Sequence, residues 1–78
     1  MPRYFFNLYN DVTTLDEEGR ELPGLASAEA HGLTEARTMA ADSVTMGHIN
    51  LHHRIEIADE RGEVLKTIHF GDAVKIKG

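Results

Sequence analysis

The stretch that decides the fold runs from Ala26 to His48 and reads ASAEAHGLTEARTMAADSVTMGH. At about 100° per residue, its apolar positions fall within one stripe and polar side chains fall opposite. The spacing therefore predicts one amphipathic helix over residues 26–48, with Ser27 as its N-cap. The apolar stripe of this helix is expected to pack on a flat surface. The stripe consists of Ala26, Ala30, Leu33, Ala36, Ala40 and Val44.

Small residues form a second feature of this predicted helix. Gly32 lies inside it, where glycine costs about 1 kcal/mol relative to alanine. With Ala36, Ser43 and Gly47 it forms a flank of small side chains beside the apolar stripe, to which another backbone can come close. His31 falls on the polar face and is expected to be exposed to solvent.

The segment before the helix begins with an aromatic run, RYFFNLYN, over residues 3–10. Side chains of this size and stiffness are typical of a β-strand. Alternation places Tyr4, Phe6 and Leu8 on one face of the strand. Phe5 and Tyr9 lie on the other face, so both faces carry aromatic side chains and both are expected to need cover.

Two turn signatures share one chemistry, DEEG at residues 16–19 and DERG at residues 59–62. Each signature predicts a type I turn closed by a glycine in the left-handed region. In the first turn, Asp16 is expected to accept hydrogen bonds from the turn backbone. Pro23 ends the strand that follows the first turn. The adjacent acids could also serve as a general acid and base, but carboxyl groups in exposed turns are seldom desolvated, so the turn-forming interpretation is favoured.

Residues 54–70, RIEIADERGEVLKTIHF, predict a β-hairpin with a three-residue bulged loop. Ile55 and Ile57 alternate with Glu56, which places both isoleucines on one face. The opposite face of the hairpin is then expected to carry Val64, Ile68 and Phe70. The predicted cross-strand pairs are Ile57 with Leu65 and Ile55 with Thr67.

Together these segments predict a single α+β domain over residues 1–78, in the order β-β-α-β-β. The helix packs on one face of a three- or four-stranded antiparallel sheet. Because a chain this short buries only roughly 60–65% of its unfolded surface, its core is thin and association would stabilise it. We expect a homodimer, or a complex with another protein, through apolar residues on the uncovered sheet face. These interface residues are Phe5, Tyr9, Val64, Ile68 and Phe70.

Composition excludes several classes of function. Thirteen acidic and eight basic residues give a net charge of -5, which disfavours binding to nucleic acid. The chain has no cysteine, so neither a disulfide nor a thiolate zinc site is available, and a reducing compartment such as the cytoplasm is expected. The sequence shows no signal-peptide pattern and no apolar run that would span a membrane.

The segment after the helix carries His48, His52 and His53. Imidazoles ligate zinc, copper or nickel, so a metal-binding loop is one hypothesis. No HExxH or comparable spacing accompanies them, and an exposed polar connection is the favoured interpretation. A nucleophile elbow, a P-loop and a GxGxxG motif are also lacking, so we expect neither an enzyme nor a cofactor.

Three stretches together resemble a group of small bacterial proteins of unknown function. They are the opening MPRYFF, the DEEGRELPGL that leads into the helix, and the closing IEIADERGEVLKTIHFGDAV. This resemblance implies no activity, cofactor or site residue, and Gly32 and the His52–His53 pair depart from it. The LPG at residues 22–24 before the helix also resembles HicB-like antitoxins. The Gly-Cys dipeptide that usually follows LPG in those proteins is missing here, and so is a DNA-binding segment. That second resemblance implies a toxin-binding regulatory partner as an alternative function.

Overall fold

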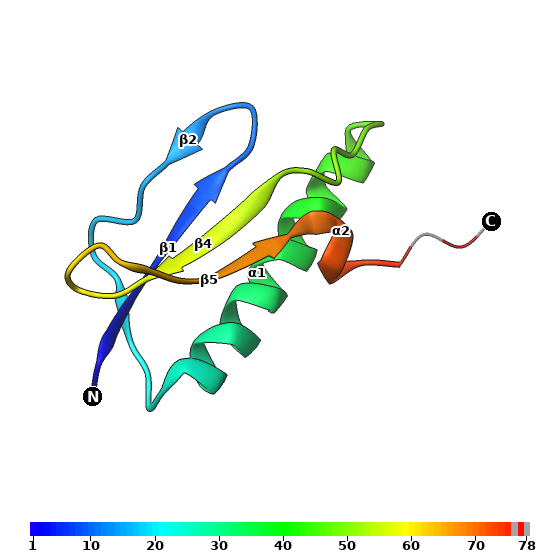
Figure 1. The fold of residues 1–78 in the computed structure, drawn as a ribbon. Helices are drawn as coiled ribbons and strands as arrows, with labels where there is room; N and C mark the ends of the chain where they lie inside the picture. The colour runs from blue at the N-terminus through cyan, green and yellow to red at the C-terminus, as the bar shows by residue number, and fades with distance from the viewer. Residues whose placement is uncertain (76, 78) are drawn as a thin grey trace.

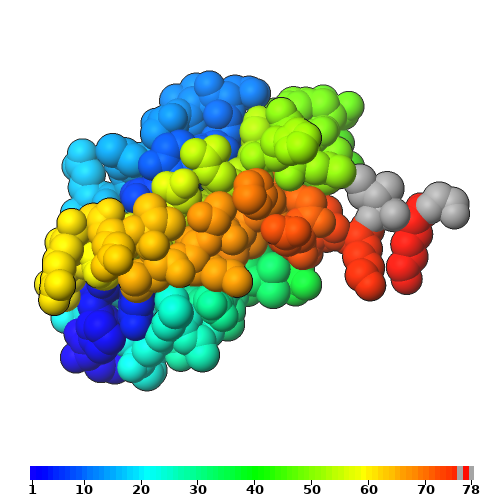
Figure 2. Space-filling view, viewed as in Figure 1, coloured from blue at the N-terminus to red at the C-terminus, as the bar shows by residue number. Residues whose placement is uncertain are grey.

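The computed structural model describes residues 1–75 and 77 and has two layers, a sheet and one long helix (Figure 1). The α+β class and the packing of the main helix on one face of an antiparallel sheet are confirmed. From the same viewpoint, β5 and the turn before it lie uncovered at the front of the molecule (Figure 2). The elements are β1 (Arg3–Tyr9), β2 (Thr13–Thr14), β3 (Arg20–Glu21), α1 (Leu25–Thr45), β4 (Arg54–Ala58), β5 (Val64–His69) and α2 (Phe70–Ala73).

Within residues 1–75 and 77, the sheet has five strands in the order β2-β1-β4-β5, with β3 also paired to β1. Strand β1 is central, which explains its aromatic side chains on both faces. One edge of β1 pairs with β4, and the other edge pairs with β2 near Leu8 and with β3 near Tyr4. The segment from residue 13 to residue 21 therefore follows a single edge of β1 but leaves a gap in the ladder between the two short strands.

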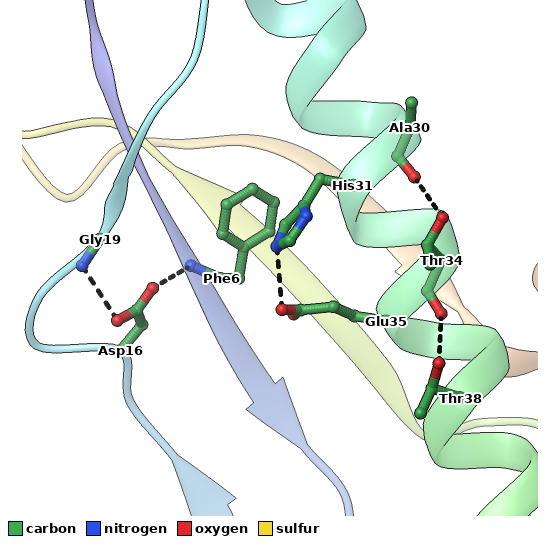
Figure 3. A network of polar contacts seen from close by, with 8 residues as sticks. All are labelled: Phe6, Asp16, Gly19, Ala30, His31, Thr34, Glu35 and Thr38. Carbon is green, nitrogen blue, oxygen red and sulfur yellow. Dashed lines mark hydrogen bonds and ion pairs between the residues drawn. The ribbon is translucent and has the colours of Figure 1, made fainter.

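Asp16 fills this gap with its side chain (Figure 3). Its carboxylate accepts a hydrogen bond from the backbone N–H of Phe6 in β1 at 3.1 Å. It also accepts from the N–H groups of Glu18 at 3.2 Å and Gly19 at 3.0 Å, as the turn chemistry predicted. The N–H of Asp16 donates to Asn7 Oδ1 at 2.9 Å. One residue thus shapes the turn and also ties it to the central strand.

Gly19 and Gly62 close the two turns in the left-handed region, at φ +70° and +83°, as predicted. A second constraint acts only on Gly19. A Cβ at this position would lie 2.8 Å from Phe5 Cε2 and 2.9 Å from Arg3 Cγ. The first turn is therefore pressed against side chains of β1, and glycine is required there for space as well as for conformation.

Helix α1 packs on the sheet through very small side chains, and the predicted apolar stripe is wrong in part. Ala26, Ala30 and Val44 of that stripe are exposed. The reason is volume, because large sheet side chains such as Ile57 and Ile68 fill the layer between sheet and helix and leave room only for small helix residues. The helix residues buried against the sheet, spaced four apart, are Ala28, Gly32, Ala36 and Ala40.

The ends of α1 also differ from the prediction. The helix begins at Leu25 after Gly24, which holds the N-cap position without a side-chain hydrogen bond, so Ser27 lies in the first turn. The helix ends at Thr45, three residues before the predicted end. Gly47, at φ +97°, turns the chain away from the helix axis.

Gly32 brings the helix close to the sheet, because an added Cβ would lie 3.0 Å from Ile68 Cδ1 and 3.2 Å from Ile57 Cδ1. We predict that Gly32→Ala lowers the free energy of unfolding by about 1 kcal/mol, since crowding outweighs the roughly 1 kcal/mol gain in helix propensity. Urea denaturation followed by circular dichroism measures this change.

The matched control is Ile68→Val, which removes the methyl group nearest to the added carbon. A double variant carrying Gly32→Ala and Ile68→Val should be more stable than the two single changes predict, by about 1 kcal/mol of coupling. Strict additivity of the two substitutions would show that Gly32 is not limited by this contact.

The β4–β5 pairing differs from the predicted register by one residue, because a β-bulge lies between Ile57 and Ala58. Beyond the bulge, this shift of one residue moves the β5 side chains from Lys66 to His69 to the other face of the sheet, whereas Val64 still pairs with Ala58. Ile68 therefore faces α1, and its exposed fraction is 6%. The observed partners of Ile55 and Ile57 are Ile68 and Lys66, where the sequence predicted Thr67 and Leu65.

Phe70 is not part of the hairpin, because β5 ends at His69 and Phe70 begins the one-turn helix α2. The backbone N–H of Phe70 donates to the carbonyl oxygen of His53 at 2.8 Å. Arg37 Nε of α1 donates to the carbonyl oxygen of Ala73 at 2.8 Å and holds α2 against α1. Phe70 is 1% exposed, so it is a core residue. The core residues are Tyr4, Phe6, Ala28, Ala36, Ala40, Ile55, Ile57, Ile68, Phe70 and Ala73.

Candidate functional site

The sheet face that points away from α1 is the candidate site, here named the open face. Residues that pair across antiparallel strands share a face, so the registers of β1, β4 and β5 define its members. Phe5 lies between Tyr4 and Phe6, which are buried toward the helix, and this places Phe5 and its partners on the open face. The three cross-strand rows are Phe5–Ala58–Val64, Asn7–Glu56–Thr67 and Tyr9–Arg54–His69.

The open face combines apolar surface with charges of both signs. Phe5 and Tyr9 are half-buried and Val64 is 46% exposed. The guanidinium carbon of Arg54 lies 4.4 Å from the centroid of the Tyr9 ring, a cation–π distance. Arg54 Nε also lies 3.2 Å from Glu56 Oε2. The face can therefore make apolar contacts with a partner and can exchange its own ion pair for one across an interface.

Three of the predicted interface residues, Phe5, Tyr9 and Val64, lie on the open face. The placement of Ile68 and Phe70 there is wrong, because both are buried inside the chain. The bulge turns Ile68 toward the helix, and α2 carries Phe70 into the core.

The sequence interpretation missed the polar members of the open face. Arg54 and Glu56 alternate with the two buried isoleucines of β4, and a period of two assigns them to the opposite face. That signal was present in the sequence. The stacking of Arg54 on Tyr9 was not, because it depends on the pairing of two strands more than forty residues apart.

The three histidines after the helix take different positions. His48 and His52 are exposed, whereas the His53 side chain is 11% exposed and its ring packs edge-on against Phe70. His53 Nε2 lies 3.4 Å from Asp11 Oδ1. His48 and His53 border one cleft of about 300 Å³, and His52 is not among its lining residues. Among the described residues, no three His, Cys, Asp or Glu side chains are grouped to hold a metal ion.

His31 was expected to be exposed, and this prediction is wrong. Its ring packs edge-on against Phe6, with 4.7 Å between the ring centroids, and its Nε2 lies 2.9 Å from Glu35 Oε1 (Figure 3). The side chain is 23% exposed. The rotation of α1 that buries Gly32 turns the neighbouring His31 toward β1, which explains the difference.

Asp59, the first acid of the second turn, bonds to the turn backbone, in line with the turn-forming interpretation. Asp59 Oδ1 accepts hydrogen bonds from the N–H groups of Arg61 at 2.9 Å and Glu63 at 3.0 Å. Asp16 has the same role in the first turn and an additional bond to β1. Both aspartates are thus occupied by turn geometry.

These features define a small α+β domain in which one sheet face is covered by a helix and the other is open. A family model described as Domain of unknown function (DUF6894) matches residues 3–71, and the chain belongs to this family. The predicted membership in a family of unknown function is confirmed, and the likeness to HicB-like antitoxins stays a prediction. No curated protein and no solved structure matched the chain. Neither helix in the described part of the chain combines the length and the apolar composition needed to cross a membrane.

Proposed function

We propose that the chain is a non-catalytic protein-binding module that forms a homodimer through its open face. The observation that carries the proposal is the one-sided cover of the sheet. Helix α1 buries one face, while Phe5, Tyr9 and Val64 remain at least partly accessible on the other. Apolar side chains gathered on one sheet face are stabilised when a second layer excludes water from them.

The size of the chain supports a second copy as that layer. A stable interface buries roughly 800 Å² on each partner. This is about 15% of the 5301 Å² accessible surface of the chain, so one such interface would extend the thin core substantially. A pair of identical domains can bury this area with the sheet faces stacked.

The charges of the open face also suit two copies. Arg54 and Glu56 lie side by side, so a two-fold axis near them would place the arginine of one copy beside the glutamate of the other. The chain as a whole carries a net charge of -5, which opposes the approach of two copies. Complementary charges on the open face would therefore select this face over the rest of the surface.

The non-catalytic part of the proposal is supported by the roles of the acidic residues. Asp16 and Asp59, the first acids of the two clusters, accept backbone hydrogen bonds within their turns. The proposed compartment is the cytoplasm, on the composition argument that a chain without cysteine needs no oxidising environment.

A charge placed on the open face should break the dimer. We predict that Val64→Asp raises the dimer dissociation constant at least tenfold, about 1.4 kcal/mol, because a carboxylate would be buried against apolar surface. Sedimentation equilibrium over a range of concentrations measures the constant.

Val44→Asp is the matched control. Val44 is 58% exposed, comparable with Val64, but it lies on α1 and belongs to the other layer. The control should leave the dissociation constant within twofold of the original chain, and circular dichroism should show both variants folded. An equal effect of the two substitutions, or a chain that stays monomeric throughout, would contradict the proposal.

A further inference from the structure

A groove on the helix side of the sheet combines apolar lining residues with a rim of carboxylates. It lies between α1 and the segment that links β2 to β3, and its volume is about 460 Å³. Its apolar lining comes from Phe6 and Leu8 of β1, Met39 of α1 and Leu15 of the linking segment. It is here named the acidic groove.

Apolar surface is accessible inside the acidic groove. Leu15 is 60% exposed, and Leu8 and Met39 are only partly buried against the core. These side chains come from three separate elements and line the same groove. Grouped apolar side chains of this kind mark contact sites more often than isolated ones.

The rim of the groove carries charge of one sign. Asp16, Glu17 and Glu18 lie on the linking segment and Glu35 lies on α1, so carboxylates border the groove from both sides. Figure 3 shows Asp16 and Glu35 on these two elements. No lysine or arginine is among its lining residues. His31 lies beside the rim and pairs with Glu35, and the two Asp16 oxygens accept backbone hydrogen bonds. The exposed carboxylates of Glu17 and Glu18 are therefore the most available to a ligand.

From this combination we infer that the acidic groove binds a short basic segment of another protein, in which lysine or arginine alternates with apolar residues. The apolar side chains would lie on Leu8, Leu15 and Met39, and the cations would meet the rim carboxylates. A second copy of this chain is a poorer occupant, because its net charge is also -5. Phe6, Leu8 and the α1 residues place the groove on the helix side of the sheet, although Leu15 and Asp16 also border a pocket beside Phe5 on the open face.

The test uses the full chain and a synthetic peptide of seven residues, acetyl-KLKLKLK-amide, titrated while amide resonances are followed by NMR. Shifts are expected at residues 15–18 and 35–39. Replacing both rim glutamates, Glu17→Gln with Glu18→Gln, should weaken binding at least tenfold, as should Leu15→Ser. A peptide with glutamate in place of lysine should not bind.

The matched control is Glu60→Gln with Glu63→Gln in the second turn, which removes the same charge from exposed positions outside the groove. It should change the affinity less than twofold. Equal weakening by the two double variants would reveal only long-range attraction and would overturn the inference. Shifts confined to the open face, or no binding at all, would overturn it as well. Sedimentation of the rim variants should show unchanged self-association. This measurement distinguishes a loss of peptide binding from a loss of the proposed homodimer.

Discussion

Phe70→Ala is expected to lower the free energy of unfolding by about 4 kcal/mol, within the range for emptying a buried phenylalanine site. The Phe70 ring is 1% exposed and lies where α2, α1 and the end of β5 meet. Its ring also packs edge-on against His53, at 5.7 Å between centroids. A loss of this size is a large share of the stability of a small domain. Urea denaturation of the original chain and the variant measures it.

Phe70→Leu guards against the outcome that the alanine variant fails to fold. Leucine keeps most of the apolar volume, so a loss of about 1 to 1.5 kcal/mol is expected. Val44→Ala provides the surface comparison and should change the free energy of unfolding by well under 1 kcal/mol, because Val44 is 58% exposed and lies outside the open face. If Phe70→Ala cost no more than Val44→Ala, the core position of Phe70 would be refuted.

Asp16→Ala is expected to cost about 3 kcal/mol, because three backbone N–H groups lose a charged acceptor at once. The bond to the N–H of Phe6 in β1 is part-buried, so water replaces the carboxylate poorly there. Asp59→Ala is the matched control, since Asp59 makes two bonds in an exposed turn of the same chemistry. It should cost about 1 kcal/mol. Equal losses at the two positions would contradict the special role of the bond to Phe6.

Acid titration tests the same residue independently. Partial burial raises the pKa of Asp16, but hydrogen bonds from Gly19, Phe6 and Glu18 and the nearby His31 outweigh it and hold the pKa below its ordinary value of 3.8. A lowered folded-state pKa stabilises the fold fully above the unfolded-state value and loses this effect as pH falls through the folded-state value. Below about pH 4, the stability difference between the original chain and Asp16→Asn should therefore shrink. A difference that stays constant from pH 6 to pH 2 would contradict this assignment.

The local features of the fold could be predicted because short stretches of sequence determine them. The chemistry of the two turns requires an aspartate and a left-handed glycine, and both occur as predicted at Gly19 and Gly62. The β1 strand could be predicted from its aromatic alternation, and the approximate length of α1 could be predicted from its apolar spacing. The α+β class follows from these elements in their order along the chain.

The relations between elements were harder to predict. A bulge of one residue at Ile57 reverses the face of Ile68, and composition does not distinguish the two registers. Hydrophobicity likewise ranks Val44 above Gly32, whereas the packing of bulky isoleucines selects the small residue. The strand register and the packing between elements also limited how many open-face residues could be predicted. Phe5, Tyr9 and Val64 were placed correctly by alternation, while Ile68 and Phe70 depended on register and on an unforeseen helix.

The most direct test of self-association through the open face is a filtered NOE experiment on an equal mixture of ¹³C-labelled and unlabelled chain, with the mass of the assembly measured on the same sample. The predicted result is a mass of twice 8.7 kDa and intermolecular contacts from the Val64 methyl groups and the Tyr9 ring, with none from Val44. A mass of 8.7 kDa at millimolar concentration, or intermolecular contacts confined to α1, would contradict it.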